Sequence, residues 1–180
     1  MLIKELKMPF RVVSSTYHEA PHEKGRPSDL VKRHALGKAL EARVPAKKGW
    51  VLGADTIVYF EGRVLGKPKS LAHAKRLLQA MSGKSHYVYT GLALRDLVTG
   101  HVLMDYERTR VKFHRLTPAF IDHYVKQVHV LDKAGAYAIQ EGDIAESIVG
   151  SYSNVVGLPL EKLRTLLKAR CQAPVPGTSA

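Results

Sequence analysis

The chain has 180 residues, 45% of them hydrophobic, and carries a formal net charge of +12 from 28 Lys and Arg against 16 Asp and Glu. This length suits one domain or two small lobes that share a core. No apolar run reaches the roughly 18 residues of a membrane span. We expect no signal peptide because the first ten residues lack an apolar segment. The single cysteine, Cys171, excludes a disulfide framework and a zinc site made of thiolates, and it predicts a reducing, cytoplasmic compartment.

The hydrophobic pattern predicts helices and strands along the whole chain. Helices are recognised by apolar residues at helical spacing after an N-cap, and strands by apolar runs or strict alternation. The first half of the chain is predicted to hold a helix end over 2–7 stopped by Pro9, a strand over 10–14, a helix over 28–43 capped by Ser28, and a strand from 51. A helix from Ser70 to Gly83 follows, and then two strands over 85–94 and 101–115 that are joined by a hairpin. The last predicted elements are a helix over 117–126, strand-like runs over 136–140 and 145–150, and a helix around 160–167. This order predicts a mixed α/β protein with a twisted, partly antiparallel sheet.

The helix over 28–43 carries an unusual apolar stripe. Its members are small residues at i, i+4, i+8 and i+11, namely Val31, Ala35, Ala39 and Ala42. Small side chains on a buried face predict that this helix packs closely against its neighbour.

A carboxylate interrupts the apolar stretch VLGADTIVYFEGRVLGKP at residues 51–68. Burying Asp55 in such a strand is costly unless something compensates its charge. Gly53 and Ala54 leave the backbone before it uncrowded, as a bulge or a closely approaching ligand requires. The local sequence leaves two interpretations open: an exposed acid at a strand end, or a carboxylate in a cleft that serves as general base or metal ligand.

Four other residues are candidates for a site. Lys67 lies between glycines and a proline in GRVLGKP and can contact a phosphate, although the segment is not a P-loop. Lys38 and Glu19 are equally compatible with a solvated surface, and Gln140 can either read a base edge or cap a strand. The nine histidines show no HxxxH or HExxH spacing, so we expect no zinc site built from histidines.

The positive charge predicts an anionic partner. Charge alone favours nucleic acid and a phosphorylated small molecule about equally, and the chain shows no RNA-binding signature.

Six sequence blocks in a fixed order resemble the Maf family of nucleoside triphosphate pyrophosphatases. The blocks are VLGADTIV, GRVLGKP, MSGKSHYVYTGLAL, YERTRVKFHRLT, DKAGAYAIQ and GSYSNVVGLPL, and the resemblance extends from Phe10 to about Leu167. It implies an α/β fold with a twisted mixed sheet, flanking helices and two lobes around a nucleotide cleft. It also implies hydrolysis of a nucleoside triphosphate to the monophosphate and pyrophosphate with a divalent cation, Mg²⁺ or Mn²⁺.

The same resemblance assigns roles to the candidate residues. Asp55 matches the catalytic residue and, together with Glu19, the metal ligands; Lys38 and Lys67 match substrate-binding lysines. Thr56 and Gln140 match specificity positions, and Asp-Thr implies the dTTP/UTP type, which includes modified pyrimidine nucleotides. A 7-methyl-GTP pyrophosphatase and a catalytically impaired regulatory protein that binds nucleotide or RNA stay open as alternatives. The partner we expect is thus a nucleoside triphosphate rather than nucleic acid or a membrane, and a homodimer stays open.

The chain departs from the family pattern in three places. A first strand and a loop of the form LASxSPRRxxLL do not precede MLIKELKMPF, so we expect either that the coding sequence begins upstream or that the protein is impaired. Glu141 stands where Gly usually follows Gln140, and Tyr17-His18-Glu19 offers fewer carboxylates than usual. With these departures, we expect residues 1–170 to form a single Maf-like domain and 171–180 a disordered tail.

Overall fold

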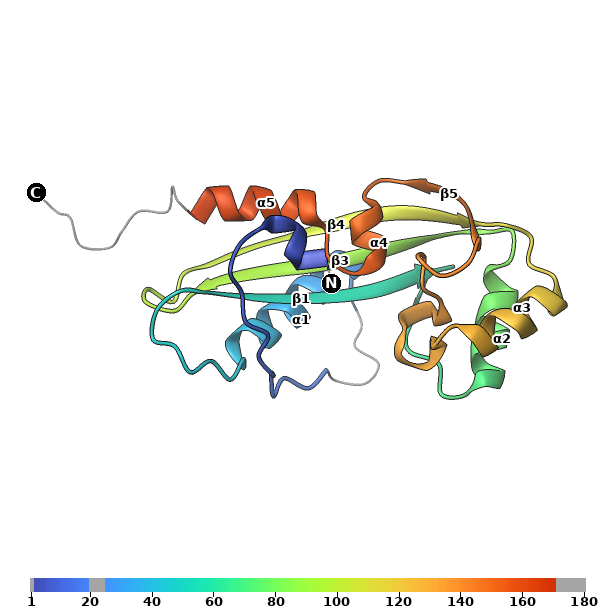
Figure 1. Cartoon of the computed structure of the whole chain (residues 1–180), viewed down its shortest axis with the longest axis horizontal. Coiled ribbons are helices and arrows are strands. Elements are labelled where there is room, and N and C mark those ends of the chain that lie inside the picture. The colour runs from blue at the N-terminus through green and yellow to red at the C-terminus, as the bar shows by residue number, and fades with distance from the viewer. Residues whose placement is uncertain (1, 20–24, 171–180) are drawn as a thin grey trace, which may run out of the picture. The chain divides into compact units, whose positions relative to one another are not determined.

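The structure, a computed structural model, describes residues 2–19 and 25–170 and is built on a five-stranded antiparallel open sheet (Figure 1). Its strands are β1 (Trp50–Phe60), β2 (Arg63–Leu65), β3 (Ser85–Asp96), β4 (Val102–Phe113) and β5 (Ala145–Val149), in the order β2-β1-β3-β4-β5. The helices are η1 (Leu2–Leu6), α1 (Pro27–Leu40), α2 (Leu71–Met81), α3 (Pro118–Gln127), η2 (Val130–Asp132), η3 (Ala134–Ala136), α4 (Tyr152–Val156) and α5 (Leu160–Ala169). The predicted α/β class is confirmed.

The chain divides into two compact units. The first unit comprises Met1–Asp55, Thr90–Glu107 and Leu158–Ala180, and the second comprises Thr56–Tyr89 and Arg108–Gly157. The strands β1, β3 and β4 each contribute residues to both units. None of the helices in the described ranges is both long and apolar enough to cross a membrane.

In the first unit, α1 lies directly on two strand glycines. A Cβ atom at Gly53 would stand 2.1 Å from the Ala35 carbonyl oxygen, and one at Gly91 would stand 2.2 Å from the Val31 carbonyl oxygen. The small stripe of α1 therefore packs as closely as predicted. Gly53 therefore has another role than expected: its missing side chain lets the backbone of α1 approach β1, and it serves neither a bulge nor a ligand.

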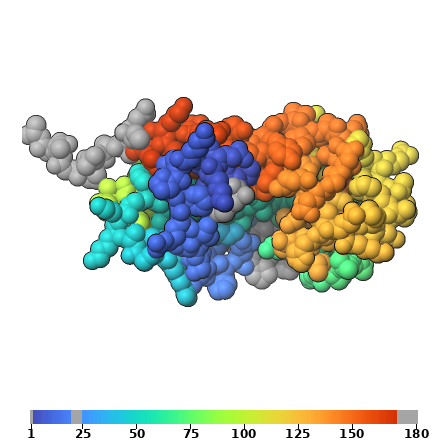
Figure 2. Space-filling view, viewed as in Figure 1, coloured from blue at the N-terminus to red at the C-terminus, as the bar shows by residue number. Residues whose placement is uncertain are grey.

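The remaining apolar residues of the first unit gather under α5. Leu92 and Leu94 of β3 form a buried cluster with Leu163 and Leu166 of α5, and Leu6 of η1 packs against it. Figure 2 shows the N-terminal segment, in blue, in contact with α5, in red. The predicted helix end over 2–7 is thus a 3₁₀ helix that docks on α5.

The core of the second unit lies between the sheet and the helices α2 and α3. It includes Val88, Phe113, Leu78, Met81 and Ile121, all at most 2% exposed. Both helices begin where the sequence predicts, because Ser70 and Thr117 accept hydrogen bonds from the backbone N–H groups of His73 and Phe120.

Several predicted elements are wrong or shifted. Residues 10–14 form no strand, and in the described part of the chain the pairing nearby is a single bridge between Ser15 and Ala42. Residues 136–140 form no strand either, because Gly135 and Ala136 adopt positive φ angles of 70° and 63° that break an extended backbone.

Other boundaries move by a few residues. The helix α1 begins at Pro27, one residue before the predicted cap, and ends at Leu40 instead of 43. Residues Arg63–Leu65 of GRVLGKP form β2, which pairs antiparallel with the end of β1. The short helix α4 was not predicted. Cys171 and the predicted tail 171–180 lie outside the described residues.

Candidate active site

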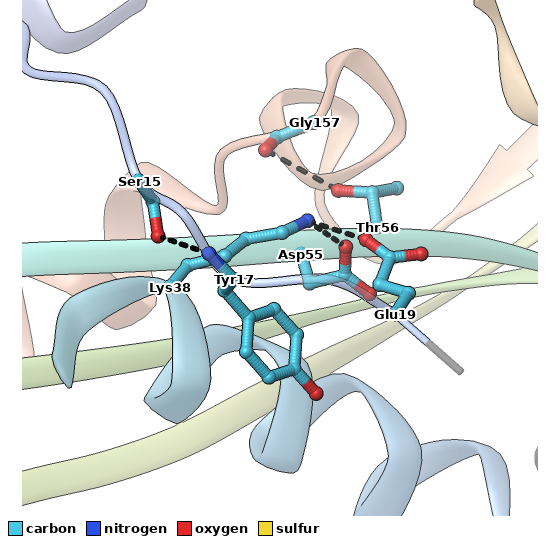
Figure 3. Close-up of polar contacts among 7 residues, drawn as sticks. All are labelled: Ser15, Tyr17, Glu19, Lys38, Asp55, Thr56 and Gly157. Atoms are coloured by element: carbon cyan, nitrogen blue, oxygen red, sulfur yellow. Dashed lines mark hydrogen bonds and ion pairs between the residues drawn. The ribbon is translucent and has the colours of Figure 1, made fainter. Parts of the chain in front are cut away.

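A lysine between two carboxylates forms the charged centre of the first unit (Figure 3). The ammonium of Lys38, near the end of α1, lies 2.5 Å from Oδ1 of Asp55 on β1 and 2.8 Å from Oε1 of Glu19. The Asp55 side chain is only 8% exposed, whereas Glu19 is half exposed. The interpretation of Asp55 as an exposed acid is therefore excluded, because its charge is buried and compensated by Lys38.

Packing of an aromatic ring helps to bring Glu19 to this centre. Tyr17 covers Gly37, where a Cβ atom would stand 2.1 Å from the tyrosine ring. The Tyr17 ring also meets His34 edge to face, with centroids 5.8 Å apart. Since His34 and Lys38 are one turn apart on α1, they occupy the same face of the helix. Neither Tyr17 nor His34 was predicted to belong to the site.

The three charged groups shift one another's protonation. Burial raises the pKa of Asp55 above its ordinary value, and the hydrogen bond and charge of Lys38 only partly oppose this. Burial would lower the pKa of Lys38, but the hydrogen bonds to Asp55 and Glu19 outweigh it, so this pKa is raised. Burial would likewise raise the pKa of Glu19, yet Lys38 holds it below its ordinary value. The centre thus combines a firmly charged lysine with a buried carboxylate that takes up a proton more readily than a solvated aspartate.

Two carboxylates and an imidazole in this centre are close enough to share a cation. One ligand atom from each of Glu19, His34 and Asp55 lies within 4.8 Å of the other two. Oδ2 of Asp55 is buried and forms no hydrogen bond within the described part of the chain. A donor set of two carboxylates and one imidazole fits a hard divalent cation such as Mg²⁺ or Mn²⁺.

The second unit contains a pocket of about 330 Å³. Its wall combines apolar valines with polar and charged side chains, and it includes three of the predicted site residues, Thr56, Lys67 and Gln140. The other lining residues are Val58, Val88, Asp132, Lys133, Ala134, Tyr137, Ala138, Glu141, Val155, Val156 and Gly157. A cavity that combines apolar surface with polar groups can hold a small organic ring that carries hydrogen-bonding atoms.

Hydrogen bonds from two buried aromatic residues hold the pocket segment that ends at Gln140. The Tyr124 hydroxyl donates to the Ala138 carbonyl and accepts from the Ala138 N–H, both at 3.0 Å. Nε2 of His86 lies 2.9 Å from the Tyr137 hydroxyl. The irregular backbone of this segment therefore has fixed partners although it belongs to no strand.

Asp55 and Thr56 follow each other on β1 but point to opposite sides of the strand (Figure 3). Asp55 contacts Lys38, whereas the Thr56 hydroxyl lies 3.4 Å from the Gly157 carbonyl oxygen. The predicted residues consequently fall into two groups: Glu19, Lys38 and Asp55 in the charged centre, and Thr56, Lys67 and Gln140 around the pocket.

Comparison with known proteins finds one family and several relatives that share one name. A family model described as Maf-like protein matches residues 1–170. A protein of Clostridium tetani named dTTP/UTP pyrophosphatase is 41% identical over 172 residues, which cover 93% of this chain and 90% of that protein. Proteins of the same name from Bacillus cytotoxicus and Bacillus anthracis are each 44% identical over 169 residues, covering 93% of this chain and 87% of their own length.

Proposed function

This chain belongs to the Maf-like family, and from that premise we propose that it hydrolyses dTTP and UTP to the monophosphate and pyrophosphate. The observation that carries the proposal is the charged centre, in which Lys38 joins the buried Asp55 to Glu19. Relatives that share 41–44% of their residues with this chain bear the name of that activity, which supports the choice of substrate.

Asp55 is the proposed general base. Water attacks the α-phosphorus of the nucleotide, its proton passes to the Asp55 carboxylate, the bond from the α-phosphorus to the bridging oxygen breaks, and pyrophosphate leaves. A base buried beside a lysine suits this step, because its raised pKa makes it a better proton acceptor than a solvated aspartate.

Lys38 offsets the negative charge that gathers on the phosphate oxygens. Its raised pKa keeps it protonated throughout the physiological range. Lys67, which lies on the rim of the pocket in the second unit, is proposed as a further phosphate ligand.

Glu19 and Asp55 are the proposed metal ligands, and His34 is added to them because it lies in the same group. A divalent cation bound there would neutralise phosphate oxygens and lower the pKa of the attacking water. Mg²⁺ and Mn²⁺ both suit this donor set.

Thr56 and Gln140 are the proposed contacts for the nucleobase. The valines of the pocket provide apolar surface for a flat ring, while the threonine hydroxyl and the glutamine amide provide directional polar groups. We also infer a cytoplasmic location, which fits a chain with one cysteine.

The test measures pyrophosphate release from dTTP, UTP, CTP, GTP and 7-methyl-GTP with Mg²⁺ or Mn²⁺. We expect dTTP and UTP to be hydrolysed fastest, and EDTA to stop the reaction. A preference for 7-methyl-GTP would assign the chain to the other substrate type, and no release from any nucleotide would overturn the proposal.

A further inference from the structure

A buried cluster of hydroxyl and amide groups fastens α4 to the sheet in the second unit. Thr109 of β4 and Asn154 of α4 both have 0% exposure. Nδ2 of Asn154 donates to Oγ1 of Thr109 at 2.9 Å and to the Val88 carbonyl at 3.1 Å. The Thr109 hydroxyl in turn donates to the Ser151 carbonyl at 3.0 Å and accepts from the Ser151 N–H at 3.1 Å. The single oxygen of Thr109 thus has its full set of three hydrogen bonds.

The helix α4 depends on this cluster for its stability. With five residues, α4 is far too short to be stable by backbone hydrogen bonds alone. The chain also enters it through Gly150, whose φ is +121° and where a Cβ atom would stand 3.0 Å from Oγ1 of Thr109. A buried network of hydrogen bonds fixes one position more strictly than apolar contacts do.

The parts that are held in place form the wall of the pocket. Val155, Val156 and Gly157 line it from α4 and its end, and Val88, whose carbonyl accepts from Asn154, lines it from β3. The position of α4 also decides where the Gly157 carbonyl lies, 3.4 Å from the Thr56 hydroxyl (Figure 3).

This contact determines the polarity of Thr56. A carbonyl oxygen can only accept a hydrogen bond, so the threonine hydroxyl is the donor in its contact with Gly157, and the threonine oxygen can act as an acceptor. A ligand atom that approaches Thr56 from the pocket must then be a donor. Uracil and thymine carry an N3–H donor, whereas the N3 atom of cytosine is an acceptor.

We propose that Thr109 and Asn154 are positioning residues that hold the Gly157 carbonyl against Thr56 and so make the pocket select uracil and thymine over cytosine. The inference rests on the proposed function, since it takes the pocket to be the nucleobase site. Neither residue touches the substrate; both act through the place of α4.

The test compares Thr109→Val, which keeps the size of the side chain and removes the hydroxyl, with Thr109→Ser, which keeps the hydroxyl. We expect Thr109→Val to raise KM for UTP about tenfold and to narrow the UTP-to-CTP ratio of kcat/KM by a similar factor, with kcat nearly unchanged. Thr109→Ser should behave like the wild type. Thr165→Val, at a threonine of α5 whose hydroxyl donates to the Glu161 carbonyl, serves as the matched control. A lower melting temperature with unchanged KM and unchanged base preference would reduce Thr109 to a structural residue and overturn the inference.

A measurement on the wild type keeps the inference testable if Thr109→Val does not fold. N3-methyl-UTP lacks the donor, so we expect its kcat/KM to fall at least tenfold below that of UTP, and equal use of the two would contradict the proposed polarity. Binding of the uncleavable α,β-imido analogues of UTP and CTP separates the two proposals. Selective binding of the UTP analogue without any hydrolysis of UTP would overturn the proposed function alone, whereas hydrolysis of UTP and CTP at equal efficiency would overturn this inference alone.

Discussion

The two units hold their candidate functional residues by different physical means. In the first unit an ammonium group bridges two carboxylates, and the side chains of Lys38 and Glu19 remain 30% and 51% exposed. In the second unit neutral groups such as Thr109 and Asn154 are fully buried and hydrogen-bonded. Charges that must meet a phosphate and a proton need access to solvent and substrate, whereas a cavity that must discriminate between rings needs a fixed wall. The difference supports the proposal that the charged centre serves chemistry and the pocket serves recognition.

The replacement Asp55→Asn is the strongest test of this division. It removes the proposed base and leaves the size of the side chain unchanged, so we expect kcat/KM for UTP to fall by roughly 10²–10⁴. Binding of α,β-imido-UTP, measured by calorimetry, should change only a few-fold. Asp105→Asn is the matched control, because Asp105 is also paired with a lysine of the first unit, Lys162, at 3.2 Å. A variant at Asp55 that kept near-normal turnover would remove the charged centre from the chemistry.

The replacement Gly53→Ala tests how strictly the first unit fixes β1. The added methyl group would overlap the Ala35 carbonyl of α1, which carries Lys38, so we expect a loss of about 3 kcal/mol in the free energy of unfolding. Urea denaturation measures it. Gly66→Ala is the control, since no atom lies within 4 Å of its Cβ position and its φ is not positive. Equal stability of the two variants would show that α1 and β1 can separate at little cost.

Acidification tests the neutral interior of the second unit. Burial lowers the pKa of His86 to about 4 from an ordinary value of 6.5. Between pH 6.5 and 4 the unfolded chain therefore binds a proton at His86 that the folded chain does not bind. The stability due to the neutral imidazole is present above pH 6.5 and is lost as the pH falls toward 4. We expect the free energy of unfolding to be about 2 kcal/mol lower at pH 5 than at pH 7.5 through this group alone.

Two variants isolate the contribution of His86 to this acid sensitivity. His86→Gln keeps a polar partner for the Tyr137 hydroxyl but does not titrate, so its unfolding should depend less on pH between 4 and 6.5 than that of the wild type. His101→Gln, at an exposed histidine, is the matched control. Identical pH profiles for the wild type and His86→Gln would mean that the imidazole is protonated as easily in the folded chain as in the unfolded one.

The replacement Gln140→Ala has the smallest expected effect, and it tests the proposed role of the pocket in recognition. Loss of one amide contact to the base should raise KM for UTP about tenfold, close to 1.4 kcal/mol, with kcat almost unchanged. Steady-state kinetics with UTP and dTTP measure it, and Gln79→Ala, at an exposed glutamine of α2, is the control. If kcat fell and KM did not, recognition and chemistry would not be divided as proposed.

The fold was predictable wherever the signal is local. Ser70 and Thr117 cap α2 and α3 with their own side chains, and the alternation of residues 85–96 needs no distant partner to be recognised. The strand expected over 10–14 failed because strand formation depends on pairing, and only Ser15 finds a bridge in the described part of the chain. The helix α4 was missed since it depends on hydrogen bonds to Thr109, a residue more than forty positions away.

The sequence allowed single residues of the candidate site to be predicted, but not their arrangement in space. The family resemblance marked Asp55 and Lys38, yet nothing in the sequence says that they meet across 17 positions. The spacing of His34 to the other histidines carries no signal, whereas its spacing to Lys38, four residues along one helix face, places it in the site. Tyr17 carries no such signal, since its contact with Gly37 arises only in the folded chain.

The opposite orientation of Asp55 and Thr56 on β1 has a consequence for how such a protein can diverge. A mutation in the codon for residue 56 alters a side chain on one side of the strand and leaves the surroundings of Asp55 as they were. With the roles proposed for these two residues, the nucleobase preference of a lineage can change without loss of hydrolysis. An insertion or deletion of one codon before Asp55 has the reverse outcome, since it would exchange the two sides and abolish both properties in a single generation.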